Sequence, residues 1–270
     1  MDHAGTPPIV LTIAGSDSGG GAGIQADLKT FHAFGAFGTT VVTAITAQNT
    51  LGVTAVHPVP LSVVIAQLDA VMSDLPPVAI KTGMLATAPL VDTVADRLAE
   101  VGTGTLVVDP VMVATSGDRL LEQDAERTIT TRLIPLAALV TPNVPEARIL
   151  TGRQVRSPEE MLDAAMAMVD AGADAVLVKG GHLEGDRLVD VLWDGKSHRS
   201  WARDRLPTHN THGTGCTLSA AIVANLAAGR SLENAVDRSL GFVEAAIRTA
   251  PGIGSGHGPL THYAPLPGED

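Results

Sequence analysis

The sequence predicts an α/β fold in which helices cover both faces of a mostly parallel sheet. Short apolar or β-branched runs alternate with segments of helical periodicity almost from end to end, and this alternation is typical of βαβ units. Polar and glycine-rich motifs follow several of these runs, at the sheet edge where such folds bind ligands. No linker-like or repeated segment divides the chain, so we expect residues 1–270 to form a single domain.

The individual elements follow from composition and spacing. Apolar and β-branched residues indicate strands at residues 8–14, 40–46, 78–81, 105–108, 137–140 and 174–178. Helical spacing indicates helices at residues 23–34, 61–72, 89–100, 158–171, 213–228 and 232–250. Ser157 followed by Pro158 is a typical helix start, and Asp194-Gly195 between the runs 188–193 and 197–201 predicts a hairpin.

Composition narrows the functional class. The chain has 270 residues, 45% of them hydrophobic and 17% charged, so it can bury a substantial core. A net charge of −11 without a Lys/Arg cluster argues against nucleic-acid binding. No apolar run approaches the ~20 residues that span a bilayer, no secretory signal is evident, and the single Cys excludes an internal disulfide. We therefore expect a cytoplasmic protein that does not bind membranes.

A glycine-bracketed turn precedes an apolar helix at residues 210–216, Asn-Thr-His-Gly-Thr-Gly-Cys. The first N–H groups of a helix lack internal partners and carry about half a positive charge, and Gly213 and Gly215 let an anion approach them closely. The same field lowers the pKa of a thiol, so we expect Cys216 to favour thiolate near neutral pH. An anion hole beside a base indicates phosphoryl transfer to a hydroxyl group. The alternative is a glycine helix start with a buried, inert cysteine.

Four further polar residues follow predicted strands. Asp109 ends one strand, Asn143 and Glu146 follow another, and Lys179 ends a third. Carboxylates with an amide can hold hydrated Mg²⁺, and a lysine can contact phosphate oxygens. Each residue alone could instead end a strand, begin a helix or extend to solvent; their common place at strand ends favours nucleotide chemistry.

Two glycine motifs are misleading. Gly21-x-Gly23 matches a loose dinucleotide fingerprint, but no acidic residue occurs between Asp27 and Asp69 to bind a ribose. Gly195-Lys196-Ser197 resembles the end of a P-loop but lies within the predicted hairpin. Among the histidines, we expect His209 and His212 to be exposed in a loop and His257 to belong to a C-terminal turn.

Several segments carry a family resemblance when they are taken together. They are residues 14–27, 46–50, 81–85, 109–113, 141–146, 179–183 and 210–217. In this combination the chain resembles the hydroxymethylpyrimidine/phosphomethylpyrimidine kinases of thiamine biosynthesis, members of the ribokinase-like superfamily. The resemblance covers nearly the whole chain and implies a three-layer α/β/α fold and a kinase that uses ATP and Mg²⁺.

The resemblance also implies roles for single residues. It implies a pyrimidine pocket, a magnesium site, a nucleotide side, and an anion hole with a base. The corresponding residues are Gly15, Asp27, Gln48 and Met84 (pyrimidine), Asp109 and Glu146 (Mg²⁺), Lys179, Thr208 and Asn143 (nucleotide), and Gly213, Thr214, Gly215 and Cys216 (anion hole and base). Relatives are often homodimers. Thr115 stands where the family often has Lys, and Pro207 where Asp commonly occurs.

The sequence thus predicts phosphorylation of the small molecule 4-amino-5-hydroxymethyl-2-methylpyrimidine and then of its monophosphate. Because Thr115 replaces a lysine, we expect a weakened contact to the phosphate of the second substrate. One alternative is a pyridoxal/pyridoxine kinase, against which the pair Asp27 and Gln48 argues, since carboxylate and carboxamide suit an aminopyrimidine. Another is a non-catalytic pyrimidine-binding protein on the same fold.

Overall fold

The computed structural model describes residues 5–102, 104–113, 117, 120–183 and 185–266. Within this part of the chain the strands form one nine-stranded sheet in the order β3-β2-β1-β4-β5-β6-β7-β8-β9. The central pairs, from β2-β1 through β1-β4, β4-β5 and β5-β6 to β6-β7, are parallel. The outer pairs β3-β2, β7-β8 and β8-β9 are antiparallel. The strands are β1 Ile9–Ser16, β2 Phe37–Asn49, β3 Gly52–Pro58, β4 Ala79–Thr82, β5 Thr105–Val108, β6 Leu139–Val140, β7 Val176–Val178, β8 Arg187–Trp193 and β9 His198–Asp204.

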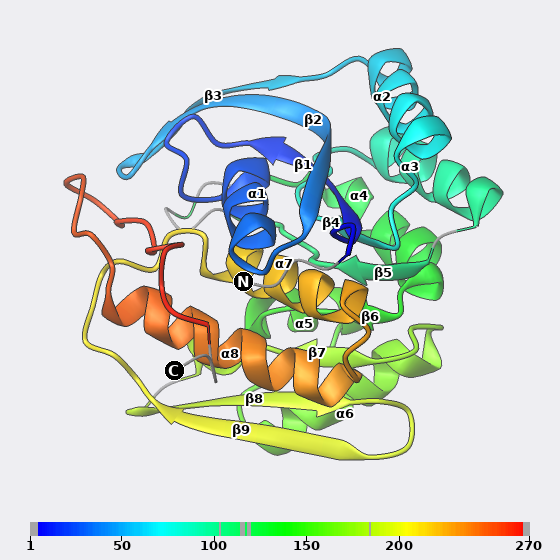
Figure 1. Cartoon of the computed structure of the whole chain (residues 1–270). Coiled ribbons are helices and arrows are strands. Elements are labelled where there is room, and N and C mark those ends of the chain that lie inside the picture. Colours follow the sequence, from blue (N-terminus) through cyan, green and yellow to red (C-terminus); the bar gives the residue numbers. More distant parts are fainter. Residues whose placement is uncertain (1–4, 103, 114–116, 118–119, 184, 267–270) are drawn as a thin grey trace.

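Helices cover both faces of the sheet, which gives the predicted three layers (Figure 1). One face carries α1 Gly23–Ala33, α7 Thr214–Ala227 and α8 Leu232–Arg248. The other carries α2 Leu61–Asp74, α3 Ala88–Val101, α4 Gln123–Thr128, α5 Val144–Thr151 and α6 Pro158–Asp170. A π-helical turn, Ile129–Leu133, and two 3₁₀ turns, Ile134–Leu136 and Gly180–His182, complete the described helical elements.

The core lies between these layers. β4 and most of β1 and β5 are fully buried, as expected for parallel strands covered on both faces. Leu11, Leu68 and Leu106 belong to one of two large apolar clusters, on the side of α2 to α6. The second cluster packs α7 and α8 against the sheet through residues such as Ile222 and Leu240. No described helix is long and apolar enough to cross a membrane.

Most predicted elements are confirmed within a few residues. The start of α6 is capped as predicted, because the Ser157 side chain accepts a hydrogen bond from the backbone N–H of Glu160. The β8–β9 hairpin is also confirmed, with Asp194 accepting hydrogen bonds at its turn. The sequence did not predict β3, α4 or α5 as elements; β3 lies at the sheet edge with mostly exposed residues, so it lacks a hydrophobic alternation.

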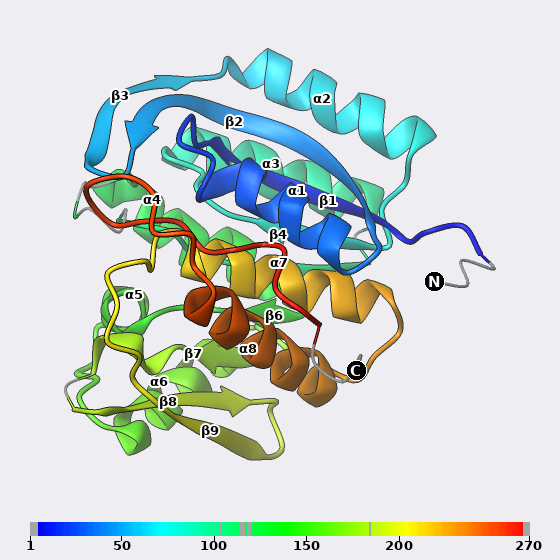
Figure 2. The same cartoon turned by 60° about the vertical axis from the view of Figure 1, so that its left-hand side comes forward.

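The arrangement brings distant segments to the carboxyl ends of the parallel strands. Residues 251–258, after α8, run beside the turn between β2 and β3 (Figure 2), where the His257 N–H donates to the Thr50 carbonyl. His212, just before α7, forms a β-bridge with Pro259. These contacts enclose the edge of the sheet where α7 begins.

Candidate functional site

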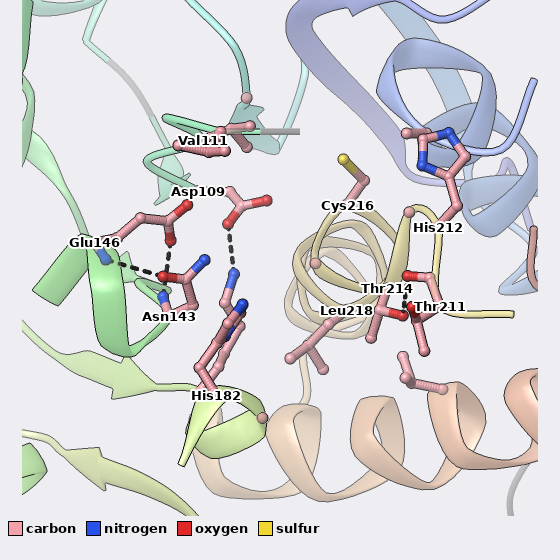
Figure 3. Close-up of a pocket in the computed structure, with 18 of the residues that line it drawn as sticks. Asp109, Val111, Asn143, Glu146, His182, Thr211, His212, Thr214, Cys216 and Leu218 are labelled. Carbon is pink, nitrogen blue, oxygen red and sulfur yellow. Dashed lines mark hydrogen bonds and ion pairs between the residues drawn. The ribbon is translucent and has the colours of Figure 1, made fainter. Parts of the chain in front are cut away.

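A cavity of about 730 Å³ opens at the carboxyl ends of the strands, where α7 begins. The sequence placed its candidate site residues at this edge, and the cavity is lined by all of them except Asp27. The lining candidates are Gly15, Gln48, Met84, Asp109, Asn143, Glu146, Lys179, Thr208, Gly213, Thr214, Gly215 and Cys216. Figure 3 shows Asp109 and Glu146 on one side of the cavity and Cys216, at the start of α7, on the other.

The start of α7 has the geometry of an anion hole. Gly213 adopts a left-handed conformation with φ +83°, and a Cβ there would lie 1.8 Å from the Gly21 carbonyl oxygen, so only glycine fits. A Cβ on Gly215 would lie 3.2 Å from the Lys179 ammonium nitrogen. The two glycines therefore let the Gly21 backbone and the Lys179 ammonium approach the start of α7. The first N–H groups of this helix lack intrahelical partners.

Cys216 lies in the first turn of α7 and is partly exposed. Burial raises the pKa of its thiol to about 11, although the nearby Lys81 ammonium and a hydrogen bond from the Gly23 backbone N–H lower it. The expectation of a thiolate near neutral pH is therefore wrong for this structure. Desolvation of a charged sulfur, together with the nearby Asp27 and Asp109 carboxylates, outweighs Lys81 and Gly23, so the resting group is a thiol.

Asp109 and Lys179 form the polar centre of the opposite wall. The Lys179 ammonium lies 2.8 Å from the Asp109 carboxylate, which also accepts hydrogen bonds from Thr141 and Ser219. Burial alone would raise the pKa of Asp109, but the attraction of Lys179 and then of Lys81 outweighs it and lowers that pKa. Attraction to Asp109 likewise overcomes burial and raises the pKa of Lys179. A carboxylate and an ammonium thus face the same space.

Asn143 and Glu146 combine two roles that the sequence offered as alternatives. They form a capping box at the start of α5, in which the Asn143 side chain accepts from the Glu146 N–H at 2.9 Å and the Glu146 carboxylate accepts from the Asn143 N–H at 2.8 Å. Both residues also line the cavity. Burial raises the pKa of Glu146 to about 7, with a smaller contribution from the Asp109 charge.

The carboxylates suit a magnesium ion bound together with phosphate. Among the described residues no cluster of three or more His, Cys, Asp or Glu side chains could enclose a metal. Mg²⁺ in kinase sites usually takes one or two carboxylates, several waters and substrate phosphates. Asp109 and Glu146, on one wall and both near Lys179, fit that pattern.

Gly15, Gln48 and Met84 lie at the other end of the cavity. A Cβ on Gly15 would lie 2.6 Å from the Met84 methyl carbon, so these two residues pack as one apolar wall. Gln48 is partly exposed, and its side-chain oxygen accepts a hydrogen bond from Thr46. An apolar wall beside a carboxamide is suited to a flat polar ring.

Asp27 does not line the cavity, unlike the other residues expected in the pyrimidine pocket. Its carboxylate is fully buried, lies 2.9 Å from the Lys81 ammonium and accepts a hydrogen bond from Thr12. Attraction to Asp27 overcomes the effect of burial and raises the pKa of Lys81, so this lysine stays charged. Lys81, which the sequence presented only as part of a motif, lines the cavity in place of Asp27.

Among the histidines, His212 also differs from its expected place. It is buried and its Nε2 lies 2.8 Å from the Asp17 carboxylate, whereas His209 is exposed as expected. His257 lies exposed in the segment after α8. The sequence signal for this pair was weak, because the two residues are far apart in the chain. Thr115 lies outside the described residues, and Pro207 is exposed just before Thr208.

The chain has close relatives of known name. Over residues 17–261 it matches the family described as phosphomethylpyrimidine kinase. It is 53% identical over 258 residues to the hydroxymethylpyrimidine/phosphomethylpyrimidine kinase of Rhizobium meliloti. This match covers 94% of this chain and 97% of that protein. It is 50% identical over 253 residues to the thiamine biosynthesis bifunctional protein ThiED of Geobacter sulfurreducens; this match covers 94% of the chain but only about half, 52%, of that protein.

The structure is also similar to a solved kinase structure. The pyridoxal kinase from Staphylococcus aureus in complex with ADP aligns with a TM-score of 0.90 and 38% sequence identity, covering 96% of this chain and 95% of that one. The three-layer kinase fold predicted from the sequence is thereby confirmed.

Proposed function

Because the chain belongs to the phosphomethylpyrimidine kinase family, we propose that it transfers a phosphoryl group from ATP to the hydroxymethyl group of 4-amino-5-hydroxymethyl-2-methylpyrimidine. We propose that it then phosphorylates the resulting monophosphate, as the name of its Rhizobium relative describes for that protein. A cytoplasmic homodimer is the form we expect, and light scattering of the purified protein tests the dimer.

A single observation carries this proposal: one cavity is lined both by residues at the ends of β1, β2 and β4, where the ring would bind, and by residues after β5, β6 and β7, where the phosphates would bind. Gln48 and Met84 line the first end, and Lys179 and Thr208 line the second. The Gly213–Cys216 turn borders both ends, so a hydroxymethyl group on a bound ring and the terminal phosphate of a nucleotide would meet beside it.

The proposed reaction is an in-line transfer. The hydroxyl oxygen of the pyrimidine forms a bond to the γ-phosphorus, and the bond from that phosphorus to the bridging oxygen of ADP breaks. The thiolate form of Cys216, which is a minor population at neutral pH, accepts the hydroxyl proton late and becomes the thiol. The transition state is loose, so positioning and charge neutralisation carry most of the rate. The backbone N–H groups at the start of α7 and the Lys179 ammonium would neutralise charge on the transferred group.

Asp109 and Glu146 would hold Mg²⁺ with the nucleotide. The bound ion neutralises part of the charge on the β- and γ-phosphates. Lys179, whose ammonium contacts Asp109, would contact the phosphate oxygens on the same wall. Lys81 keeps positive charge near Cys216 and so favours the thiolate, the form that can accept the hydroxyl proton.

The second candidate is a pyridoxal kinase, favoured by the similarity to the Staphylococcus aureus enzyme. Asp27 and Gln48 were expected to distinguish an aminopyrimidine from pyridoxal. Of these two residues, only Gln48 lines the cavity. Initial rates of ADP formation with each alcohol, at saturating ATP and Mg²⁺, test the choice. We expect the larger kcat/KM with the hydroxymethylpyrimidine. A larger kcat/KM with pyridoxal would favour the second candidate, and no turnover with either would favour a binding protein.

A further inference from the structure

Asp17 holds the glycine-rich loop between β1 and α1 in one conformation. Its carboxylate accepts hydrogen bonds from the backbone N–H groups of Gly19 at 2.7 Å, Gly21 at 3.1 Å and Ala22 at 2.8 Å. The same carboxylate lies 2.8 Å from Nε2 of His212. Both side chains are buried, with 3% and 7% of the two residues exposed. One buried side chain therefore holds three backbone N–H groups of the loop.

The proton in this contact lies on the histidine. Burial alone would raise the pKa of Asp17, but the hydrogen bonds from His212 and from the loop N–H groups outweigh it and lower that pKa. An ionised carboxylate only accepts hydrogen bonds, so Nε2 of His212 donates. Charge-assisted hydrogen bonds of this kind are the stronger class, which suits a contact that must fix geometry.

Two chain segments that bracket the Cys216 thiol meet at this contact. The glycine-rich loop ends at Gly23, whose backbone N–H is hydrogen-bonded to the Cys216 sulfur. The second segment begins at His212 and leads through Gly213 into the first turn of α7, which carries Cys216. The backbone N–H of His212 also donates to the carbonyl of Gly258, at 3.1 Å. Asp17 thus fixes the donor loop, and His212 fixes the turn that bears the sulfur. Figure 3 shows His212 and Cys216 on that turn.

The two backbones are also in direct contact. A Cβ on Gly213 would lie 1.8 Å from the carbonyl oxygen of Gly21, and one on Gly21 would lie 2.5 Å from Cδ2 of His212. Because packing is this close, loss of the link between Asp17 and His212 would let the loop and the turn separate. Displacements of about 1 Å in a catalytic arrangement can lower a rate roughly 100-fold.

We propose that Asp17 and His212 are positioning residues that hold the Cys216 sulfur against the Gly23 N–H and fix the anion hole. This inference rests on the proposed kinase function, in which Cys216 is the base. Neither residue contacts the transferred group in the proposal. The charged groups that face the sulfur are Lys81 from β4, Asp27 from α1 and Asp109 after β5.

The first test compares His212→Leu with His212→Gln. The amide of Gln can donate to Asp17, whereas Leu cannot. We expect His212→Leu to lower kcat by roughly 10- to 100-fold with a much smaller change in KM for ATP, and His212→Gln to recover most of the loss. The matched control is His262→Leu. His262 is equally buried and contacts α7 through Thr217, but it does not line the cavity, so its loss should leave kcat nearly unchanged.

A second readout does not depend on turnover. Cys216 is the only cysteine, so the rate of alkylation by iodoacetamide as a function of pH reports its thiol alone. In His212→Leu, loss of the Gly23 contact should move the midpoint of that profile to higher pH, and His262→Leu should not move it. If the unmodified protein has no kinase activity, the proposed function fails while the alkylation profile still decides the positioning role.

Three results would overturn the proposal. They are unchanged kcat and alkylation profile in His212→Leu, equal effects of His212→Leu and His262→Leu, or no recovery in His212→Gln. If His212→Leu does not fold, judged by circular dichroism, Asp17→Asn replaces it, since it keeps the shape of the side chain and removes its charge. Unchanged kcat and alkylation in Asp17→Asn would then overturn the proposal.

Discussion

The ammonium of Lys81 lies 2.9 Å from the carboxylate of Asp27, and neither side chain is exposed to solvent. This pair joins β4 to α1 beneath the cavity, and Thr12 on β1 donates a further hydrogen bond to the carboxylate at 2.6 Å. Two charges withdrawn from water are tolerated because each is compensated by the other and by a hydrogen bond. Lys81 therefore stays charged close to Cys216, and its effect on the thiol pKa is opposed by the Asp27 carboxylate.

Removing one member of this pair should destabilise the protein strongly. Lys81→Met leaves the Asp27 carboxylate buried without its cation, and we expect a loss of about 3–5 kcal/mol in the free energy of unfolding. The double variant Asp27→Leu/Lys81→Met should be more stable than Lys81→Met alone. Urea denaturation of the variants measures both quantities. A double variant less stable than Lys81→Met would show that the two side chains are not coupled as described.

The sequence predicted the edge of the sheet at which the site lies, because the carboxyl ends of parallel strands necessarily meet there. Gly15, Asp109 and Lys179 follow different strands and line one cavity for this reason. The sequence could not show whether a side chain on α1 points toward the sheet or toward the cavity. Asp27 is the example. The β3 strand escaped prediction because its exposed face carries no hydrophobic alternation.

Other features depend on tertiary contacts. The link between Asp17 and His212 joins residues 195 positions apart, so no local pattern marks it. The thiol pKa of Cys216 was expected to fall because the sequence shows the helix start but not the extent of desolvation, which dominates in the folded protein. Family resemblance pointed to residues that line one cavity, but it did not show their burial or their partners.

Gln48 is expected to contact the polar edge of the pyrimidine. In Gln48→Leu that edge would be buried without its partner, at a cost of about 1–3 kcal/mol in binding. The KM for the hydroxymethylpyrimidine should rise accordingly, while the KM for ATP stays nearly constant. Steady-state kinetics with each substrate varied in turn provide the measurement. Equal increases in both KM values would point to a general disturbance of the cavity.

Thr115 bears on the second phosphorylation. The family resemblance implies a lysine at this position, and a lysine would neutralise the phosphate of the monophosphate substrate. A charge-assisted hydrogen bond contributes about 1.5–3 kcal/mol, so Thr115→Lys should lower the KM for the monophosphate roughly tenfold or more. The KM for the unphosphorylated alcohol should barely change. If both KM values move together, or neither moves, position 115 does not contact that phosphate.

His262 should make stability depend on pH. Burial, with a smaller contribution from Lys29, lowers its pKa from 6.5 to about 4. Because the unfolded chain binds this proton more readily than the folded one, the stabilising contribution is complete above pH 6.5 and is lost as the pH falls toward 4. The slope is at most about 1.4 kcal/mol per pH unit. Urea denaturation across this range should show a steeper loss in the unmodified protein than in His262→Leu; identical slopes would refute the assignment.

The role of Cys216 as the base gives the most direct test of the account. The measurement is kcat for phosphorylation of the hydroxymethylpyrimidine by the unmodified protein, Cys216→Ser and Cys216→Asp. We expect Cys216→Ser to lower kcat by roughly 10²–10⁴ with little change in substrate KM, and Cys216→Asp to retain more activity than Cys216→Ser. Since the resting thiol has a pKa of about 11, kcat of the unmodified protein should also rise with pH above neutrality. An unaltered kcat in Cys216→Ser would contradict the assignment of Cys216 as the base.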